Sequence, residues 1–326
     1  MNAVANTFIT YDSTDELVSI ITCSPEIIVE PVLHIGEGSN LLFRSDFPGT
    51  ILMSHIHGIE VLKQTEDTVY VNVGAGLKMD GFIADALEKG WYGLENLSNI
   101  PGQVGASAVQ NIGAYGIEAG DFIHEVHCVS LKNGSLRVFS HDECQFGYRH
   151  SIFKTKEFFG CYAVTHVVYK LNLAFKPHLD YGGIRQHLMK KGLELSELTA
   201  HQLREAIISI RCTKLPDPKV FGNAGSFFMN PIIDEQLYNE LRTRYKEMPS
   251  YLLEDGRRKI PAAWLIEQCG WKGRSLGNAG VHEKQPLVLV NLGSATATEI
   301  QSLSDRIVSD IKEKFGIDIH PEVLFV

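Results

Sequence analysis

The sequence predicts an α+β fold in which short strands come first and most of the helices follow. Short β-branched segments separated by glycine turns fill the first half of the 326-residue chain. After about residue 196, apolar residues recur at the spacing of amphipathic helices. Strands and helices are therefore largely segregated along the chain, whereas a doubly wound parallel sheet alternates them. A chain of this length is expected to form two or three domains.

Strands are predicted in several stretches of the first half. The stretch VLHIGEGSN is a short apolar run that ends in a glycine turn, and TVYVNVGAG alternates Val69, Val71 and Val73 on one face. Two β-rich runs flank Asn133 and Gly134, a pair that strongly indicates a hairpin. The stretch FFGCYAVTHVVYKLNLAF is a further strand region.

Four helices are predicted. MDGFIADALEKG and LTAHQLREAIISIR carry apolar residues at helical spacing, and KIPAAWLIEQCG places Pro261 in its first turn and Gly270 at its end. The clearest helix is TATEIQSLSDRIVSDIKEKFG, where Thr296 and Glu299 match a capping box and Gly316 ends an apolar stripe. The last ten residues, IDIHPEVLFV, are predicted to form a strand.

Composition excludes several classes of protein. The six cysteines show no metal-binding or disulfide spacing, which is typical of reduced thiols in the cytoplasm. No apolar run reaches the roughly 18 residues of a membrane span, and the polar N-terminus does not resemble a signal peptide. We therefore expect a cytoplasmic protein that is not associated with a membrane. We also expect a monomer. No histidine spacing indicates a metal site, and His55 and His57 are read as a strand or turn pair.

The net charge of −9 argues against a nucleic acid partner, since phosphate backbones bind to positive surfaces. A small phosphorylated ligand needs only a local basic cluster. Arg211, Lys214 and Lys219 in RCTKLPDPK form one candidate cluster.

Glycine-rich stretches are the first candidates for a binding site. GEGSNLLF can hold an anion with its backbone N–H groups, although taken alone it is more typical of a tight turn. Neither it nor GAGLKMDG matches a dinucleotide fingerprint or a P-loop. The third stretch, GLENLSNIPGQVGASAVQNIGAYG, has few charges and little periodicity. An irregular segment of this length is uncommon in a domain unless it is functional or disordered, and its low charge argues against disorder. We predict that a large polar cofactor lies along it and satisfies its backbone groups.

Five motifs together resemble one enzyme family. GEGSNLLF, the long glycine-rich stretch, FGYRHSIFK, RCTKLPDPKVFGNAGSFFMNP and HPEVLFV occur in the order found in UDP-N-acetylenolpyruvoylglucosamine reductases, also called UDP-N-acetylmuramate dehydrogenases. The resemblance covers nearly the whole chain, from Asn6 onward. LDYGGI resembles the tyrosine-bearing segment of the longer of the family's two subtypes.

The resemblance implies a fold and a domain order. The fold is the FAD-binding α+β fold of the vanillyl-alcohol oxidase type, with two N-terminal FAD-binding subdomains and a C-terminal α+β substrate-binding domain. By the same resemblance, residues 1–63 form the first subdomain, with the strand 317–326 nearby, residues 64–210 the second, and residues 211–316 the substrate-binding domain.

The resemblance also implies a reaction. NADPH passes a hydride to bound FAD, and reduced FAD passes it to the enolpyruvyl double bond of UDP-N-acetylglucosamine enolpyruvate. The product is UDP-N-acetylmuramate, an early precursor of peptidoglycan. Members of the family have no separate Rossmann domain for NADPH, in agreement with the missing dinucleotide fingerprint.

Three residues match the catalytic positions of the family. Arg149 matches the active-site arginine, whose planar guanidinium suits a carboxylate. Ser226 matches the proton donor to the second carbon, and Glu322 the acidic residue that orients or protonates near the enolate. Read without the family, Ser226 is equally compatible with a residue that caps the turn after Gly225.

Binding residues are assigned by the same resemblance. The residues expected to bind the cofactor lie in the two glycine-rich stretches and are Gly36, Gly38, Ser39, Asn40, Leu41, Pro101, Gly102, Gly105, Ala106, Ser107, Gln110, Asn111, Gly113, Ala114 and Tyr115. The residues expected to bind the substrate are Tyr148, Tyr181, Lys214, Asn230 and Gln285.

Two other functions share these features. A flavin oxidase of the same fold passes electrons to O₂, and a non-catalytic module binds only a flavin or a sugar nucleotide; fold alone does not separate them from the reductase. Ser226, Glu322 and the stretch RCTKLPDPKVFGNAGSFFMNP favour the reductase, because an oxidase has no reason to carry them.

Overall fold

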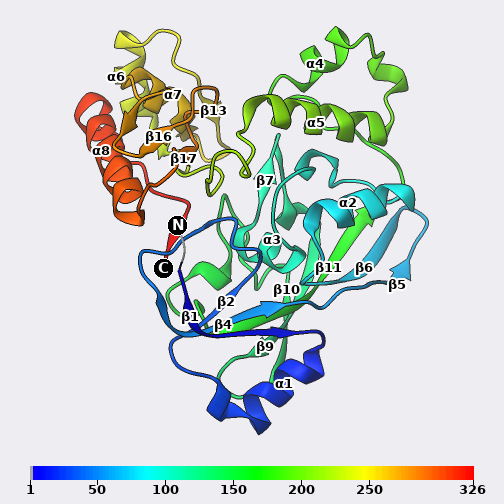
Figure 1. Ribbon diagram of the computed structural model, residues 1–326. Coiled ribbons are helices and arrows are strands. Elements are labelled where there is room, and N and C mark those ends of the chain that lie inside the picture. The colour runs from blue at the N-terminus through cyan, green and yellow to red at the C-terminus, as the bar shows by residue number, and fades with distance from the viewer. Residues whose placement is uncertain (1–2) are drawn as a thin grey trace. The chain divides into compact units, whose positions relative to one another are not determined.

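The structure is a computed structural model that describes residues 3–326 (Figure 1). The contacts within it divide the chain into two compact units. The larger unit comprises Ala5–Gly38 and Phe47–Arg211, and the smaller unit comprises the described residues up to Val4 together with Ser39–Asp46 and Cys212–Val326. The division into three domains expected from the sequence stays a prediction.

The larger unit is built on two sheets. An antiparallel five-stranded sheet has the order β10 (Leu136–Ser140), β9 (Ile123–Ser130), β11 (Tyr162–Asn172), β6 (Thr68–Gly74), β5 (Ile59–Gln64). A parallel three-stranded sheet has the order β1 (Ala5–Tyr11), β4 (Phe47–Ser54), β2 (Val32–Ile35). The short strands β7 (Gly113–Ala114) and β8 (Ile117–Glu118) form a separate antiparallel pair.

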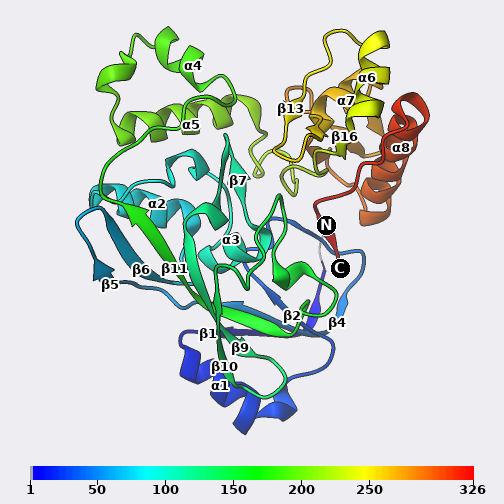
Figure 2. The ribbon, with the colours of Figure 1, turned by 180° about the vertical axis from the view of Figure 1, so that it is seen from behind.

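The larger unit also contains several helices. They are α1 (Thr14–Cys23), α2 (Met79–Glu88), α3 (Val104–Gln110), α4 (Ile184–Lys190) and α5 (Ala200–Lys214), whose last three residues belong to the smaller unit. Short 3₁₀ helices cover Pro25–Ile27, Glu95–Leu97, Ala119–Asp121, Ile152–Lys154 and Leu195–Glu197. Helices α2 and α3 lie on the same side of the five-stranded sheet (Figures 1 and 2) and share one core with its inner face.

The predicted alternation in β6 explains that core. Val69, Val71 and Val73 are fully buried, while the residues between them are partly exposed. Phe82 of α2 packs against Tyr169 of β11 with ring centroids 5.0 Å apart. The predicted hairpin is also confirmed, since β10 pairs antiparallel with β9.

The smaller unit contains short strands and three helices. Its sheets are β12 (Ile232–Ile233), β14 (Arg258–Lys259), β13 (Tyr251–Leu252) in one, and β15 (Ser275–Leu276), β16 (Ala279–Val281), β17 (Leu289–Asn291) in another. Strand β18 (Leu324–Phe325) pairs in parallel with β3 (Leu41–Leu42). The helices are α6 (Glu235–Arg244), α7 (Ala262–Gln268) and α8 (Ala297–Phe315).

The predicted ends of α8 are confirmed. The Thr296 hydroxyl accepts a hydrogen bond from Glu299 N at 3.2 Å, and Glu299 Oε2 accepts one from Thr296 N at 2.8 Å. Gly316 ends the helix in the left-handed region at φ 70°, which glycine adopts without strain.

The structure corrects three local predictions. The long glycine-rich stretch contains α3; its small residues pack closely and give no apolar periodicity, and a Cβ on Gly105 would lie 2.9 Å from Ala75 Cβ. Within the last ten residues only Leu324–Phe325 form a strand, and Pro321, which lacks an N–H, makes only an isolated bridge with Phe228. Pro261 is the N-cap residue of α7 rather than part of its first turn.

Candidate functional site

Two glycine-rich segments of the larger unit lie against each other. A Cβ on Gly36 would come within 3.2 Å of Gln103 Oε1 and 3.3 Å of Ala106 Cβ. Gly36 follows β2, and Gln103 immediately precedes α3. Glycine at position 36 therefore permits the close approach of the two segments.

These segments present backbone donors without protein partners. Within residues 3–326, the N–H groups of Gly36, Glu37, Gly38, Gly102 and Gln103 donate to no other residue. Gly102 and Gln103 are buried, and a buried N–H group normally has an acceptor. We call Gly36–Gly38 and Gly102–Gln103 the donor loops. Their unbonded N–H groups fit the phosphate oxygens of an anionic cofactor.

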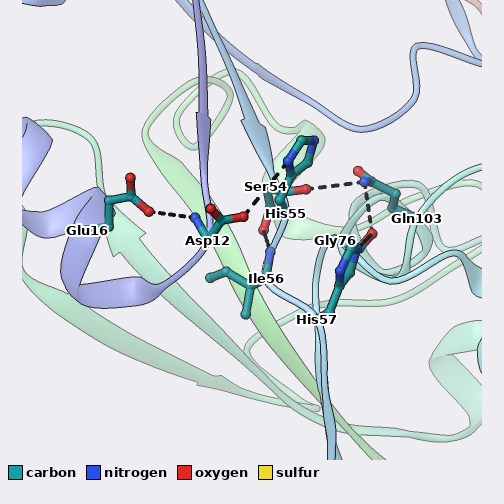
Figure 3. A network of polar contacts seen from close by, with 8 residues as sticks. All are labelled: Asp12, Glu16, Ser54, His55, Ile56, His57, Gly76 and Gln103. Carbon is teal, nitrogen blue, oxygen red and sulfur yellow. Dashed lines mark hydrogen bonds and ion pairs between the residues drawn. The ribbon is translucent and has the colours of Figure 1, made fainter.

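The Gln103 side chain is bonded to two backbone carbonyl groups on neighbouring segments (Figure 3). Its amide nitrogen donates to the carbonyl oxygens of Ser54, at 3.2 Å, and Gly76, at 3.0 Å. The latter oxygen also lies 3.2 Å from His57 Nε2. Gln103 thus joins the ends of β4 and β6 to the start of α3. Gln103 is not among the residues predicted from the sequence; its signal there is a long polar side chain in an otherwise small and apolar loop.

Other residues expected to bind the cofactor have protein partners. Ser107 is buried; its hydroxyl donates to Val104 O at 2.7 Å and shares a 2.7 Å hydrogen bond with the Tyr169 hydroxyl. The Asn111 amide donates to Glu118 Oε2 and Gly147 O, each at 2.7 Å. These side chains shape the loop, and their part in cofactor binding stays a prediction.

Arg149 occupies a tight turn of the larger unit. Gly147 and His150 exchange backbone hydrogen bonds on either side of it, and Arg149 has φ 54°, which is unusual for a residue with a side chain. Arg149 Nη2 donates to Gly113 O at 2.7 Å, and the guanidinium lies 5.4 Å from the centre of the Tyr148 ring. The structure therefore brings Arg149 and Tyr148 to the segment Gly113–Tyr115.

Tyr181 lies beside the same segment. A Cβ on Gly116 would come within 3.4 Å of Tyr181 Cβ, and one on Gly182 would come within 2.6 Å of the Tyr115 ring. Burial raises the pKa of Tyr115, and the charge of Arg211 partly opposes it. The Tyr115 phenol consequently stays protonated at neutral pH and can donate a hydrogen bond.

Ser226 and Glu322 lie on adjoining segments of the smaller unit. Glu322 N donates to Phe227 O at 2.8 Å, and Phe227 N donates to Leu287 O at 2.7 Å. The Ser226 hydroxyl makes no hydrogen bond within residues 3–326. The turn at Gly225 is held instead by Asn223 Oδ1, which accepts from Gly225 N at 3.0 Å. The capping role considered for Ser226 thus lacks its hydrogen bond.

The remaining predicted residues of the smaller unit lie on several elements. Lys214 is exposed at the end of α5. Asn230 Oδ1 accepts from Ala262 N, at 2.9 Å, at the start of α7. Gln285 lies beside Leu287, and Asn40 Nδ2 donates to Glu322 O at 3.1 Å. Ser39 precedes Asn40, and Leu41 pairs with Leu324. The Ser226 segment thus neighbours those of Gln285 and Glu322.

The described part of the chain was compared with the geometry of metal sites and of membrane-spanning helices. In residues 3–326, no group of three histidine, cysteine or acidic side chains has metal-binding geometry. The rings of His55 and His57 stack with centroids 6.4 Å apart. No helix between residues 3 and 326 is both long and apolar enough to cross a membrane.

Two family models match the chain. One describes an FAD binding domain and matches residues 5–140; the other describes the C-terminal domain of UDP-N-acetylenolpyruvoylglucosamine reductase and matches residues 217–326. A reductase of that name from Bacteroides fragilis (strain YCH46) is 49% identical over 319 residues, which cover 98% of this chain and 94% of the relative. A reductase of the same name from Porphyromonas gingivalis (strain ATCC 33277) is 46% identical over 295 residues, which cover 90% of this chain and 86% of the relative.

A solved structure supports the fold. The crystal structure of the Thermus caldophilus UDP-N-acetylenolpyruvylglucosamine reductase matches with a TM-score of 0.64 at 21% identity, covering 98% of this chain and 91% of that chain. The predicted family resemblance, and the predicted combination of an FAD-binding part with a C-terminal domain, are confirmed.

Proposed function

The chain belongs to the UDP-N-acetylenolpyruvoylglucosamine reductase family, and we propose that it uses NADPH to reduce UDP-N-acetylglucosamine enolpyruvate to UDP-N-acetylmuramate. It is an FAD-containing oxidoreductase of peptidoglycan synthesis. The observation that carries the proposal is the similarity to reductases of that name over nearly the whole chain.

The donor loops are the proposed site of the FAD diphosphate. Their N–H groups lack acceptors within residues 3–326, and two of the five belong to buried residues. Gln103 anchors its own loop to the ends of β4 and β6 through its bonds to Ser54 O and Gly76 O. When bound, FAD supplies the hydride that adds to the enolpyruvyl double bond.

Arg149 is proposed to bind the carboxylate of the enolpyruvyl group. Hydride addition to one carbon of the vinyl ether places negative charge on the neighbouring carbon and on that carboxylate. A guanidinium fixed in advance stabilises this charge more in the transition state than in the ground state. The left-handed turn and the bond to Gly113 O hold Arg149 in place before substrate arrives.

Ser226 is proposed to deliver the proton to the second carbon. A hydroxyl is a weak acid, so this role suits only a strongly basic, enolate-like intermediate. Its hydroxyl has no partner among residues 3–326 and is therefore available to a ligand. Glu322, on the adjoining segment, is proposed to orient the intermediate or assist its protonation.

The remaining proposals concern substrate binding, oligomeric state and cellular location. We propose that Lys214 and Asn230 hold the carboxylate and the phosphates, that Tyr181 closes over the diphosphate, and that Tyr148 and Gln285 complete the binding set. Lys214 and Lys219 supply a local positive charge on an acidic chain of net charge −9. We further propose that the protein acts as a monomer in the cytoplasm, which sedimentation of the FAD-loaded protein and cell fractionation test.

Product analysis tests the proposed reaction. The FAD-loaded protein is incubated without oxygen with NADPH and UDP-N-acetylglucosamine enolpyruvate, and parallel samples receive NADH. We expect one UDP-N-acetylmuramate for each NADPH oxidised, and the NADH samples compare the two nicotinamide cofactors. NADPH oxidation without the lactyl ether product contradicts the proposal.

A further inference from the structure

The turn that carries Arg149 is tied to the end of α3 at several points. Four side-chain hydrogen bonds join residues 147–154 to residues 109–113: Asn111 Nδ2 to Gly147 O at 2.7 Å, Arg149 Nη2 to Gly113 O at 2.7 Å, Ser151 Oγ to Val109 O at 2.6 Å, and Lys154 Nζ to Gln110 Oε1 at 3.1 Å. The Arg149 turn is consequently fixed to the long glycine-rich stretch.

Lys154 is the member of this set that also contacts the Arg149 backbone. Its ammonium donates to Arg149 O at 2.8 Å as well as to Gln110 Oε1. Arg149 has φ 54°, and a non-glycine residue keeps such a conformation only when its surroundings enforce it. A charged donor on the adjacent carbonyl is one such constraint, since hydrogen bonds from ammonium groups are stronger than those between neutral groups.

We propose that Lys154 is a positioning residue for the reduction: it holds the Arg149 backbone in the left-handed region and so places the guanidinium for the substrate carboxylate. This inference rests on the proposed role of Arg149. Without the ammonium, Arg149 O loses a donor and the backbone can relax to negative φ. The guanidinium then moves from its position beside Gly113 O, and a displacement of about 1 Å can cost about 100-fold in rate.

Three variants test the proposal in the FAD-loaded enzyme. Lys154→Met removes the charge and the donors but keeps the length of the side chain. Lys154→Arg keeps a charged donor. Lys156→Met is the matched control, because Lys156 lies two residues away, is exposed, and makes no hydrogen bond or ion pair within residues 3–326.

We expect Lys154→Met to lower kcat by about 10- to 100-fold, with a smaller rise in KM, because the carboxylate contact strengthens in the transition state. Lys154→Arg restores most of the rate, and Lys156→Met behaves as wild type. FAD per chain, from flavin absorbance, stays unchanged in all three, and the melting curves show each variant folded at the assay temperature. Loss of FAD or of folded protein in Lys154→Met overturns the proposal, since Lys154 then acts through the cofactor or the fold.

Arg149→Ala separates this inference from the proposed function. If Arg149→Ala turns over normally, the proposed role of Arg149 is wrong. If Arg149→Ala is slow but Lys154→Met is normal, only the role of Lys154 is wrong. When the roles of Arg149 and Lys154 are both as proposed, adding Lys154→Met to Arg149→Ala causes no further loss of rate, because both changes remove the same interaction. A full additive loss in the double variant contradicts positioning through Arg149.

Discussion

Ser226 is held in place by its neighbours rather than by its own hydroxyl. Phe227 and Phe228 on its C-terminal side are buried, and on its other side Gly225 N is bonded to Asn223 Oδ1. The Phe227 backbone is bonded to Leu287 and Glu322. The hydroxyl itself has no partner among residues 3–326, so it is available to a ligand on a backbone that these contacts hold in place.

Ser226→Ala tests the proposed proton donation. We expect turnover to fall by about 10²- to 10⁴-fold, the usual contribution of a positioned proton donor, while NADPH still reduces the flavin at the wild-type rate. Steady-state turnover and anaerobic flavin bleaching measure the two steps separately. Ser294→Ala is the control, since Ser294 is exposed and its side chain makes no hydrogen bond within residues 3–326. Wild-type turnover in Ser226→Ala would rule out the assigned role.

At this scale, sequence reasoning finds residues inside recognisable motifs and misses those that support them. Ser226, Arg149 and Glu322 can be predicted because each lies in a motif that resembles the family. Gln103 and Lys154 lie in the same motifs, but their importance depends on which carbonyl oxygens they reach. Those distances follow from the folded backbone and cannot be obtained from residue order.

At the scale of elements, one ion pair connects α2, α5 and the start of the long glycine-rich stretch. Arg204 of α5 donates to both oxygens of Asp80 in α2, at 2.6 and 3.1 Å. Asn99 N donates to Asp80 Oδ1 at 2.6 Å, and Arg211 donates to Asn99 O at 3.2 Å. Burial alone would raise the pKa of Asp80, but these donors and the two arginine charges hold it below its usual value.

Asp80→Asn is expected to lower the free energy of unfolding by about 1–2 kcal/mol at neutral pH, which is the value of a charged hydrogen bond reduced for partial exposure. A lowered folded-state pKa stabilises the protein above the unfolded-state pKa of about 3.9. The difference between wild type and variant therefore disappears as the pH falls through the lower folded-state pKa. Urea unfolding at several pH values measures it.

Asp85→Asn is the control for this prediction, because Asp85 lies in the same helix, is exposed and makes no side-chain hydrogen bond within residues 3–326. A loss of stability in Asp80→Asn that persists unchanged at acidic pH would show that the ion pair is not its cause.

The capping box of α8 permits a second prediction for an element. Thr296→Ala removes the hydroxyl that accepts from Glu299 N, and we expect it to cost about 1 kcal/mol of stability. Thr298→Ala, at an exposed position in the first turn of the same helix, should cost less because it removes no cap. Thermal unfolding compares the two variants, and equal losses would mean that the cap does not stabilise α8.

Elements with a clear period or cap could be predicted, and those defined by distant contacts could not. The valines of β6 and the ends of α8 follow from local sequence. Helix α3 escaped prediction because its glycine and alanine residues pack against other backbone and leave no apolar stripe. The last ten residues are mostly not a strand, since residues 320–322 make only an isolated bridge with the segment around Phe228, and regular pairing with Leu41–Leu42 begins at Leu324.

At the scale of the whole molecule, FAD binding should raise the free energy of unfolding. Addition of FAD to the apoprotein is expected to stabilise it by about 2.7 kcal/mol at a free concentration 100 times Kd. Riboflavin carries the same ring system without the diphosphate, so it should stabilise the protein much less, because the N–H groups of the donor loops keep no acceptor. Melting temperatures with each ligand measure the difference. Equal stabilisation by riboflavin and FAD would contradict phosphate binding by these loops.

The class of fold and the family were accessible from the sequence because five long motifs occur in order over the whole chain. The boundaries of the two compact units were not accessible from the sequence, since the contacts assign Ser39–Asp46 to the same unit as the C-terminal residues. Such long-range association depends on pairing between β3 and β18, which are two residues long and carry almost no periodic signal.

The central claim is that electrons pass from NADPH to the enolpyruvyl group, and anaerobic stopped-flow measurement of flavin absorbance tests it directly. NADPH is mixed with the FAD-loaded protein, and the reduced protein is then mixed with UDP-N-acetylglucosamine enolpyruvate or with O₂. We expect NADPH to bleach the flavin, and the enolpyruvyl substrate to restore its absorbance much faster than O₂ does. A flavin that stays oxidised with NADPH, or that O₂ reoxidises while the enolpyruvyl substrate does not, would contradict the account.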